Sequence, residues 1–132
     1  MSGIGAGDKG YRITLEDRSE YLFVKVEGEF DAPEISTRYW DEIAEKCSEL
    51  RPSRLFVEED LRKQIETIAD VYEAAAESST RALLGIRIAF FDTQPDHYEK
   101  NLFAELVSRN RGLNVKVFRS REQAVEWLLA DE

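Results

Sequence analysis

The chain has 132 residues, of which 42% are hydrophobic and 34% are charged. This length predicts one domain that buries a substantial core. We place that domain at residues 11–132, after a Gly-rich flexible tail at residues 1–10. The formal net charge of −9 argues against nucleic acid or an anionic membrane as the main partner, because both repel a negative surface.

The hydropathy pattern predicts a cytoplasmic protein without membrane insertion. No apolar run approaches the roughly 20 residues of a membrane-spanning helix, and the first ten residues lack the basic and then apolar regions of a signal peptide. The single cysteine, Cys47, excludes an internal disulfide and any multi-cysteine metal site. Because Cys47 lies among apolar residues at helical spacing, we expect a buried, unreactive thiol.

Alternating hydrophobicity predicts a β-hairpin at the start of the domain. Apolar residues occupy alternate positions from Tyr11 to Leu15 and again from Leu22 to Val26. A polar, turn-like segment at residues 17–20 separates the two runs, so they are expected to pair as antiparallel strands.

A helix is expected directly after this hairpin. Asp31 is a suitable N-cap, Glu34 completes a capping-box spacing, and Pro33 fits the first helical turn. Apolar residues then recur about every four positions as far as Leu50, and Pro52 ends the pattern.

The rest of the chain alternates short apolar strands with helices. The strands are predicted at residues 55–57, 87–92 and 114–118. A second helix carries the apolar residues of 65–76. A third ends at Gly112 and carries these apolar residues: Leu102, Phe103, Leu106 and Val107.

A last helix begins after Ser120, with Gln123 at the capping-box position. The order β-β-α-β-α-β-α-β-α predicts an α/β fold with a mixed, mostly parallel sheet and an N-terminal β-hairpin.

Acidic residues follow two neighbouring strands of the predicted sheet. Glu58, Glu59 and Asp60 come directly after the short strand at 55–57, and Asp92 ends the next strand. Because ligands of open α/β sheets bind beyond the carboxyl ends of parallel strands, we expect these four carboxylates to form one rim that faces a partner or ligand.

Oxygen ligands of this kind suit Mg²⁺, so a Mg²⁺-dependent hydrolase that uses Glu58, Asp60 and Asp92 is one hypothesis. A receiver-type Mg²⁺ site would have a lysine at the end of the last strand, whereas Lys116 lies within the strand at 114–118. We therefore assign no catalytic residue, cofactor or metal.

Three aromatic or titratable residues need separate interpretation. The single histidine, His97, has no partner cysteine and no nucleophile elbow, so we expect an exposed side chain in a first helical turn. Tyr39 and Trp40 are adjacent and cannot both point fully into the core. We favour core or edge packing for them, with a contact surface as the alternative.

The order of elements and four segments resemble the SpoIIAA-like branch of the STAS domains, a fold also described as STAS/SEC14-like. The segments are VKVEGEFD, RLFVEED, RIAFFD and VKVFRSREQAVEWL, and the resemblance covers residues 11–129. The last segment is the most distinctive, because it combines a strand, a cap and a helix with Ala124, Trp127 and Leu128. The resemblance implies a bacterial regulatory module that binds a protein partner and is not an enzyme.

In the anti-sigma antagonist branch, phosphorylation of a serine after the third strand releases the partner, since the phosphate adds negative charge to the contact surface. The resemblance places Thr67 at that position and makes it the candidate phosphosite. The adjacent hydroxyl and the glycine of the motif are missing, and Ile68 replaces a small residue. We therefore expect that the phospho-switch is lost.

Three functions stay open on the sequence. The first is a non-catalytic protein-interaction module that uses the acidic rim. The second is a small-molecule or lipid-binding module with an apolar pocket lined by Phe56, Phe90 and Phe103, and the third is the Mg²⁺-dependent hydrolase. Homodimer formation is also open, because an edge strand and the Tyr39–Trp40 surface both favour pairing.

Overall fold

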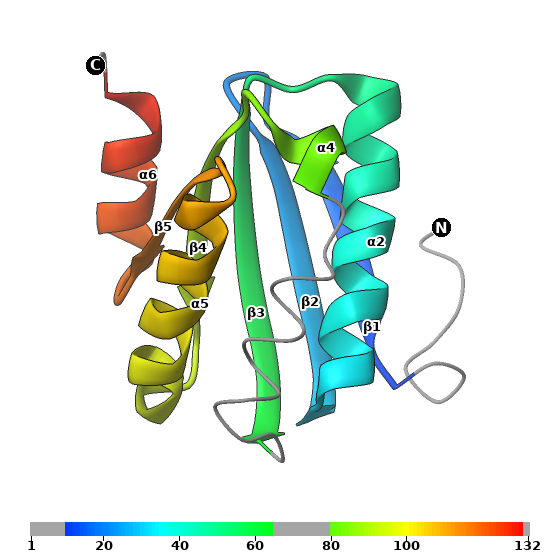
Figure 1. Cartoon of the computed structure of the whole chain (residues 1–132), viewed down its shortest axis with the longest axis vertical. Helices are drawn as coiled ribbons and strands as arrows, with labels where there is room; N and C mark the ends of the chain where they lie inside the picture. The colour runs from blue at the N-terminus through cyan, green and yellow to red at the C-terminus, as the bar shows by residue number, and fades with distance from the viewer. Residues whose placement is uncertain (1–9, 65–79, 131–132) are drawn as a thin grey trace.

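Five strands form one mixed sheet in the computed structural model, which describes residues 10–64 and 80–130. The strands lie side by side in chain order (Figure 1), and their bounds are β1 Arg12–Asp17, β2 Leu22–Asp31, β3 Arg54–Gln64, β4 Arg87–Asp92 and β5 Asn114–Phe118. β1 and β2 are antiparallel, and every later pair is parallel. The predicted mixed α/β fold with an N-terminal hairpin is confirmed.

The hairpin has the predicted alternation. Arg12 pairs with Glu27 at one end of β1, and Asp17 pairs with Leu22 at the other. In the turn, the Asp17 side chain accepts a hydrogen bond from the backbone N–H of Ser19 at 2.9 Å. This bond supports the left-handed backbone of Ser19, whose φ is 62°.

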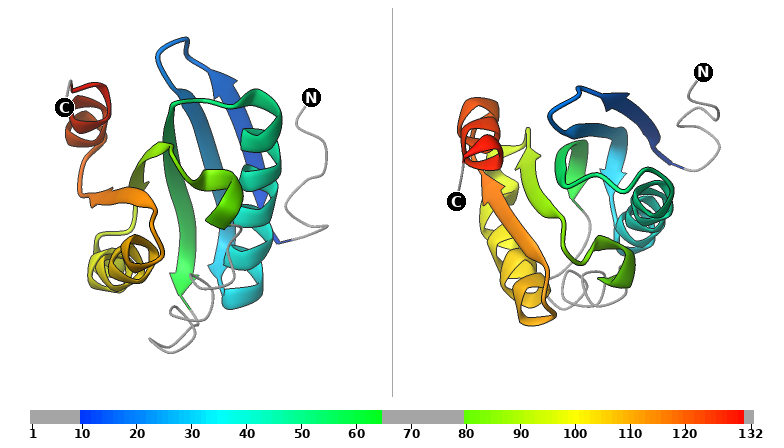
Figure 2. Two further views of the ribbon diagram at one scale, coloured as in Figure 1. Left: turned by 45° about the horizontal axis from the view of Figure 1, so that its top comes forward. Right: turned by 90° about the horizontal axis from the view of Figure 1, so that it is seen from above.

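The helices lie on both faces of the sheet (Figure 2). Their bounds are α2 Pro33–Leu50, α4 Thr80–Leu83, α5 Tyr98–Asn110 and α6 Arg121–Leu129, and a 3₁₀ turn, η1, spans Pro95–His97. Side chains of α2, α4 and the first turn of α5 pack against one core, whereas α6 packs on the opposite face over a smaller core. No helix of the described residues is long and apolar enough to cross a membrane.

Alternation along the central strands divides the two cores. Leu55 and Val57 of β3 belong to the larger core, while Phe56 between them belongs to the smaller one. In the same way Phe90 lies in the larger core and Phe91 in the smaller. Within β3 and within β4, an odd or even residue number therefore decides which of the two cores a side chain faces.

Two predicted boundaries are wrong. β3 does not end at Val57 but continues to Gln64, because β2 runs alongside and pairs with it as far as Asp31 opposite Gln64. Asp31 is consequently the last residue of β2 rather than a helix cap. Ala32 occupies the N-cap of α2 and makes no side-chain capping bond.

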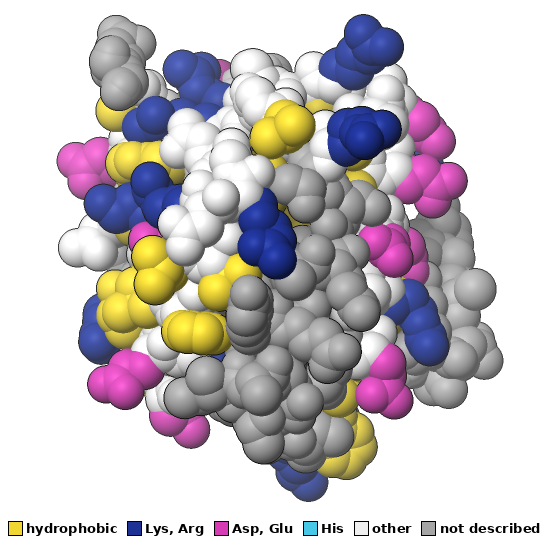
Figure 3. Space-filling view, viewed as in Figure 1, with side chains coloured by type: hydrophobic (Ala, Val, Ile, Leu, Met, Phe, Trp, Pro, Cys, Tyr) yellow, Lys and Arg dark blue, Asp and Glu magenta, His cyan; other side chains and the backbone are white. Residues whose placement is uncertain are grey.

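Both later helices occur where the sequence predicts them. In α6, the Ser120 hydroxyl accepts the predicted hydrogen bond from the backbone N–H of Gln123 at 3.1 Å. In α5, Val107 is buried, whereas Leu102 and Leu106 are 39% and 56% exposed. Figure 3 shows hydrophobic side chains gathered over this helix.

Three predictions lie outside the described residues, wholly or in part. The helix at residues 65–76 and the candidate phosphosite Thr67 lie wholly outside them. Of the tail at residues 1–10, only Gly10 is described. Its carbonyl oxygen lies against β2, only 2.6 Å from where a Cβ on Gly28 would be.

Candidate functional site

The acidic run of β3 is divided between the two faces of the sheet. Glu59 pairs with Asp92 across β3 and β4, and Glu58 pairs with Phe91. Because successive residues of a strand point to opposite faces, Glu58 and Asp60 lie on the α6 face, while Glu59 and Asp92 lie on the α2 face. The four carboxylates predicted as one rim therefore form separate contacts.

On the α6 face, Glu58 is held by Arg121. The guanidinium donates two hydrogen bonds, Nε to Oε1 at 2.8 Å and Nη2 to Oε2 at 2.9 Å. The Glu58 side chain is 3% exposed and that of Arg121 is 61% exposed. The hydrogen bond to Glu58, followed by the charge of that carboxylate, raises the pKa of Arg121. Glu58 thus connects β3 to the start of α6.

Asp60 lies at the edge of the same face and connects β3 to the end of β4. Its Oδ1 accepts hydrogen bonds from the Thr93 hydroxyl at 2.8 Å and from the Gln94 amide at 3.3 Å. The Arg62 guanidinium approaches the same oxygen at 4.0 Å. Of the four predicted rim residues, Asp60 alone is more than a tenth exposed, since the other three are buried.

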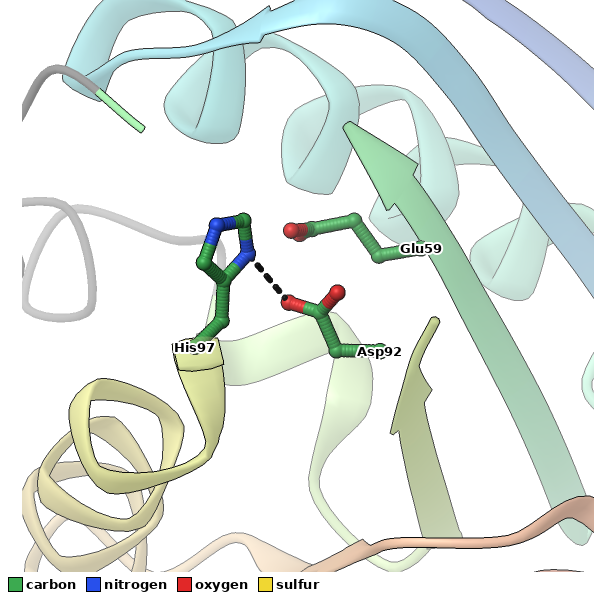
Figure 4. Close-up of side chains that lie close together, drawn as sticks. All are labelled: Glu59, Asp92 and His97. Carbon is green, nitrogen blue, oxygen red and sulfur yellow. Dashed lines mark hydrogen bonds and ion pairs between the residues drawn. The ribbon is translucent and has the colours of Figure 1, made fainter. Parts of the chain in front are cut away.

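On the α2 face, Glu59, Asp92 and His97 form a buried cluster. The three side chains point toward one another from β3, the end of β4 and η1 (Figure 4). His97 Nδ1 lies 3.1 Å from Asp92 Oδ2, and one ligating atom from each residue falls within 4.8 Å of the others. His97 is only 2% exposed, so the prediction of an exposed histidine is wrong.

Further hydrogen bonds fix the orientation of both carboxylates. Asp92 Oδ2 accepts from the Asn101 amide at 3.0 Å, and Asp92 Oδ1 accepts from the backbone N–H of Gln94 at 2.9 Å. The Tyr39 hydroxyl donates to Oε1 of Glu59. Each carboxylate thus has a neutral side-chain donor that sets its direction, and Asp92 also contacts the imidazole.

The burial of His97 has a physical cause that periodicity does not reveal. Pro95 begins a 3₁₀ turn directly after β4, and this turn brings His97 back over the strand end. There Asp92 supplies a buried acceptor for the ring. The spacing Asp92, His97 and Asn101 after a buried strand was the available signal, because the carboxyl end of a parallel strand is where polar side chains of an α/β sheet meet.

A hollow lies at the far end of β2 and β3, beside Asp60. Its volume is about 470 Å³, and it is lined by Gly28, three basic side chains and three acidic ones: Arg12, Arg62, Lys63, Glu27, Glu29 and Asp60. An ion pair of 3.4 Å joins Lys63 to Glu29, and both side chains are 64% exposed. This is an open surface, and the side chains that line it among the described residues are all charged.

Two of the three hypotheses from the sequence conflict with this geometry. Phe56 and Phe90 lie on opposite faces of the sheet and cannot line one pocket. Glu58 and Asp92 also lie on opposite faces, so they cannot bind one Mg²⁺ ion.

The adjacent pair Tyr39 and Trp40 packs as expected for core and edge residues. Tyr39 is buried, and Trp40 is half-buried and stacks on Phe90 with ring centroids 6.2 Å apart. The single cysteine is also buried, and that burial raises the pKa of the Cys47 thiol to about 11.

Comparison of the chain with protein-family models and with curated proteins finds no match.

Proposed function

We propose that this chain is a non-catalytic protein-interaction module of SpoIIAA-like type, whose partner binds the tip formed by β2 and β3. The hollow beside Asp60 carries this proposal, because it gathers three positive and three negative side chains on one surface. The resemblance of the sequence to a partner-binding branch of the STAS domains supports it. We place the module in the cytoplasm.

In the part of the chain that the structure describes, the tip is a two-stranded extension of the sheet. β1 pairs with β2 only as far as Glu27, and β4 pairs with β3 only as far as Glu59. Beyond these points β2 and β3 pair with each other, from Gly28 opposite Leu61 to Asp31 opposite Gln64. Charged side chains on such an extension are accessible to a protein segment that approaches along the strands.

The chemistry of the hollow favours a protein segment over a lipid. An apolar ligand would have to desolvate six charged side chains without pairing them, which is costly. A segment with charges of both signs can pair with them instead. The existing pair of Lys63 and Glu29 is exposed, and surface pairs of this kind contribute only about 0–1 kcal/mol. The pair can therefore open at little cost when a partner binds.

The contacts of Glu58 and Asp60 support a scaffold role for these carboxylates rather than catalysis. Glu58 joins α6 to the sheet through Arg121, and Asp60 joins β3 to the segment after β4 through Thr93. We further propose that binding does not depend on a phosphate at Thr67, since the motif that accepts it in the resembling proteins is incomplete in this sequence.

The test is capture from a lysate of the source cell by three forms of the protein, followed by binding measurements on the purified partner. The first form is wild type and the second is Arg62→Glu/Lys63→Glu. The third, Lys46→Glu, is a control on the outer side of α2, where Lys46 is half exposed. We expect wild type and the control to bind one protein with equal affinity, and the double variant to bind it at least about tenfold more weakly, as two lost charge pairs imply.

Equal binding by all three forms would show that the tip is not the contact surface. Capture of nothing specific by wild type would contradict the interaction module itself. A homodimer that forms through this surface is the other possible complex. Light scattering on the purified wild type would detect it, and the double variant would then be a monomer.

A further inference from the structure

We infer that Glu59, Asp92 and His97 form a binding site for a divalent metal ion of the first transition row, such as Zn²⁺ or Mn²⁺. The site lies on the α2 face of the sheet, away from the charged tip. It stands independently of the proposed partner binding, because no residue of the cluster lines the hollow.

The positions of the three donors fit one ion. Metal–ligand bonds of about 2.0–2.2 Å to nitrogen and oxygen place neighbouring ligand atoms about 3–3.5 Å apart. His97 Nδ1 and Asp92 Oδ2 already have such a separation, 3.1 Å, and the third ligating atom, from Glu59, lies within 4.8 Å of both. Binding of one ion requires the Glu59 oxygen to approach the other two donors to a similar separation. Figure 4 shows the ring edge that carries Nδ1 turned toward both carboxylates.

The donor set selects the class of metal. Two carboxylates and one imidazole are hard and intermediate ligands, which suit Zn²⁺, Mn²⁺ and Fe²⁺. Mg²⁺ prefers an all-oxygen shell with several waters and fits a site with a nitrogen donor poorly. When an ion binds, it takes the lone pair of Nδ1, and the neutral ring carries its proton on Nε2.

Burial strengthens the argument. Glu59 and Asp92 are 3% and 7% exposed, and two carboxylates so close together in a buried place repel each other unless a positive charge lies between them. A divalent ion supplies that charge in full.

The surrounding hydrogen bonds have the arrangement that metal sites use to orient their ligands. Asn101 donates to Asp92, and Tyr39 donates to Glu59. Outer donors of this kind fix the direction of the ligating carboxylates, and their loss typically reduces metal affinity by about 10–100-fold. The structure thus provides both the ligands and the groups that position them.

The single histidine of the chain makes the test direct. His97 gives the only imidazole signals in a ¹H–¹⁵N spectrum, so binding at this site is observed without assignment of the whole protein. We would titrate metal-free, full-length protein with Zn²⁺. We expect the ring ¹⁵N signals to move to new positions that saturate at one equivalent, and calorimetry to give a single site. Mn²⁺ should broaden the same signals, while Mg²⁺ should leave them in place.

Two variants test the assignment of the ligands. Asp92→Asn and Glu59→Gln each remove one charged ligand with little change in shape, so that at least one folded variant is expected. Each should weaken Zn²⁺ binding by more than about tenfold, since loss of a ligand exceeds loss of an outer donor. Glu58→Gln is the matched control, because it removes a buried carboxylate on the other face of the sheet and should leave Zn²⁺ affinity unchanged.

Imidazole signals that stay fixed in folded wild-type protein at excess Zn²⁺ would overturn the inference, even if calorimetry detects binding elsewhere. Equal affinity of the wild type and both ligand variants would overturn it as well. The two proposals fail separately. Arg62→Glu/Lys63→Glu should lose partner capture and keep Zn²⁺ binding, whereas Asp92→Asn and Glu59→Gln should lose Zn²⁺ binding and keep partner capture.

Discussion

Replacement of Arg121 by methionine tests whether the first acid of the β3 run supports the fold. Methionine keeps most of the aliphatic length of arginine and removes the guanidinium. Glu58 would then lose two hydrogen bonds of 2.8 and 2.9 Å while its carboxylate stays buried. We expect Arg121→Met to reduce the free energy of unfolding and to loosen the start of α6.

The magnitude follows from the burial of the two partners. Removal of one partner of a fully buried ion pair costs about 3–5 kcal/mol, whereas an exposed pair contributes about 0–1 kcal/mol. Glu58 is 3% exposed, but Arg121 is 61% exposed, so water can reach the carboxylate once the guanidinium is gone. We therefore expect a loss of about 2–3 kcal/mol, between the two limits. At about 2.1 cal/mol/K of unfolding entropy per residue, this lowers the melting temperature by roughly 7–11 °C.

Urea and thermal unfolding of three variants measure this loss. The control is Lys46→Met, which breaks an exposed pair with Glu49 at 3.5 Å and should cost less than about 0.5 kcal/mol. The double variant Glu58→Met/Arg121→Met should be more stable than Arg121→Met, because it also removes the buried charge. An Arg121→Met loss no larger than that of the control, or no recovery in the double variant, would refute the assignment of Glu58 to the fold.

Two further predictions concern backbone packing and the cysteine. Gly28→Ala should destabilise the protein by about 1–3 kcal/mol in urea unfolding, because its Cβ would lie 2.6 Å from the Gly10 carbonyl oxygen; an unchanged stability would show that Gly10 does not pack there. Burial raises the pKa of the Cys47 thiol from 9.0 to about 11. The stability that the neutral thiol contributes is therefore fully present below pH 9 and is lost as the pH rises through 11. This loss amounts to at most about 3 kcal/mol. The stability difference between wild type and Cys47→Ala should therefore shrink from pH 8 to pH 11, and a constant difference would contradict this.

Local signals in the sequence were sufficient for much of the fold. The hairpin follows from alternating residues and a polar turn, and both strands occur where the alternation predicts them. The last strand and helix are also confirmed, because the Ser120 cap and its bond to Gln123 depend only on residues three positions apart. Such features need no information about distant parts of the chain.

The errors come from contacts between distant segments. β3 extends through three acids because β2 continues to pair with it, and no local propensity favours a strand there. His97 is buried because its ring forms a hydrogen bond with the carboxylate of Asp92. The helical period also does not decide which of the apolar residues Leu102, Leu106 and Val107 of α5 meets the sheet. In the structure Val107 is buried, and the two leucines are exposed.

The extended β3 strand changes how the acidic run has to be probed. Since neighbours in a strand point to opposite faces, Glu58, Glu59 and Asp60 have separate surroundings and separate partners. Charge reversal at Glu58 would place a lysine beside Arg121 in a buried position, so any lost binding would be inseparable from a damaged fold. Arg62 and Lys63 are mainly exposed, and their reversal changes the surface with little effect on the core. A binding defect in that double variant can therefore be attributed to recognition, whereas the same defect after substitution of the buried acids cannot.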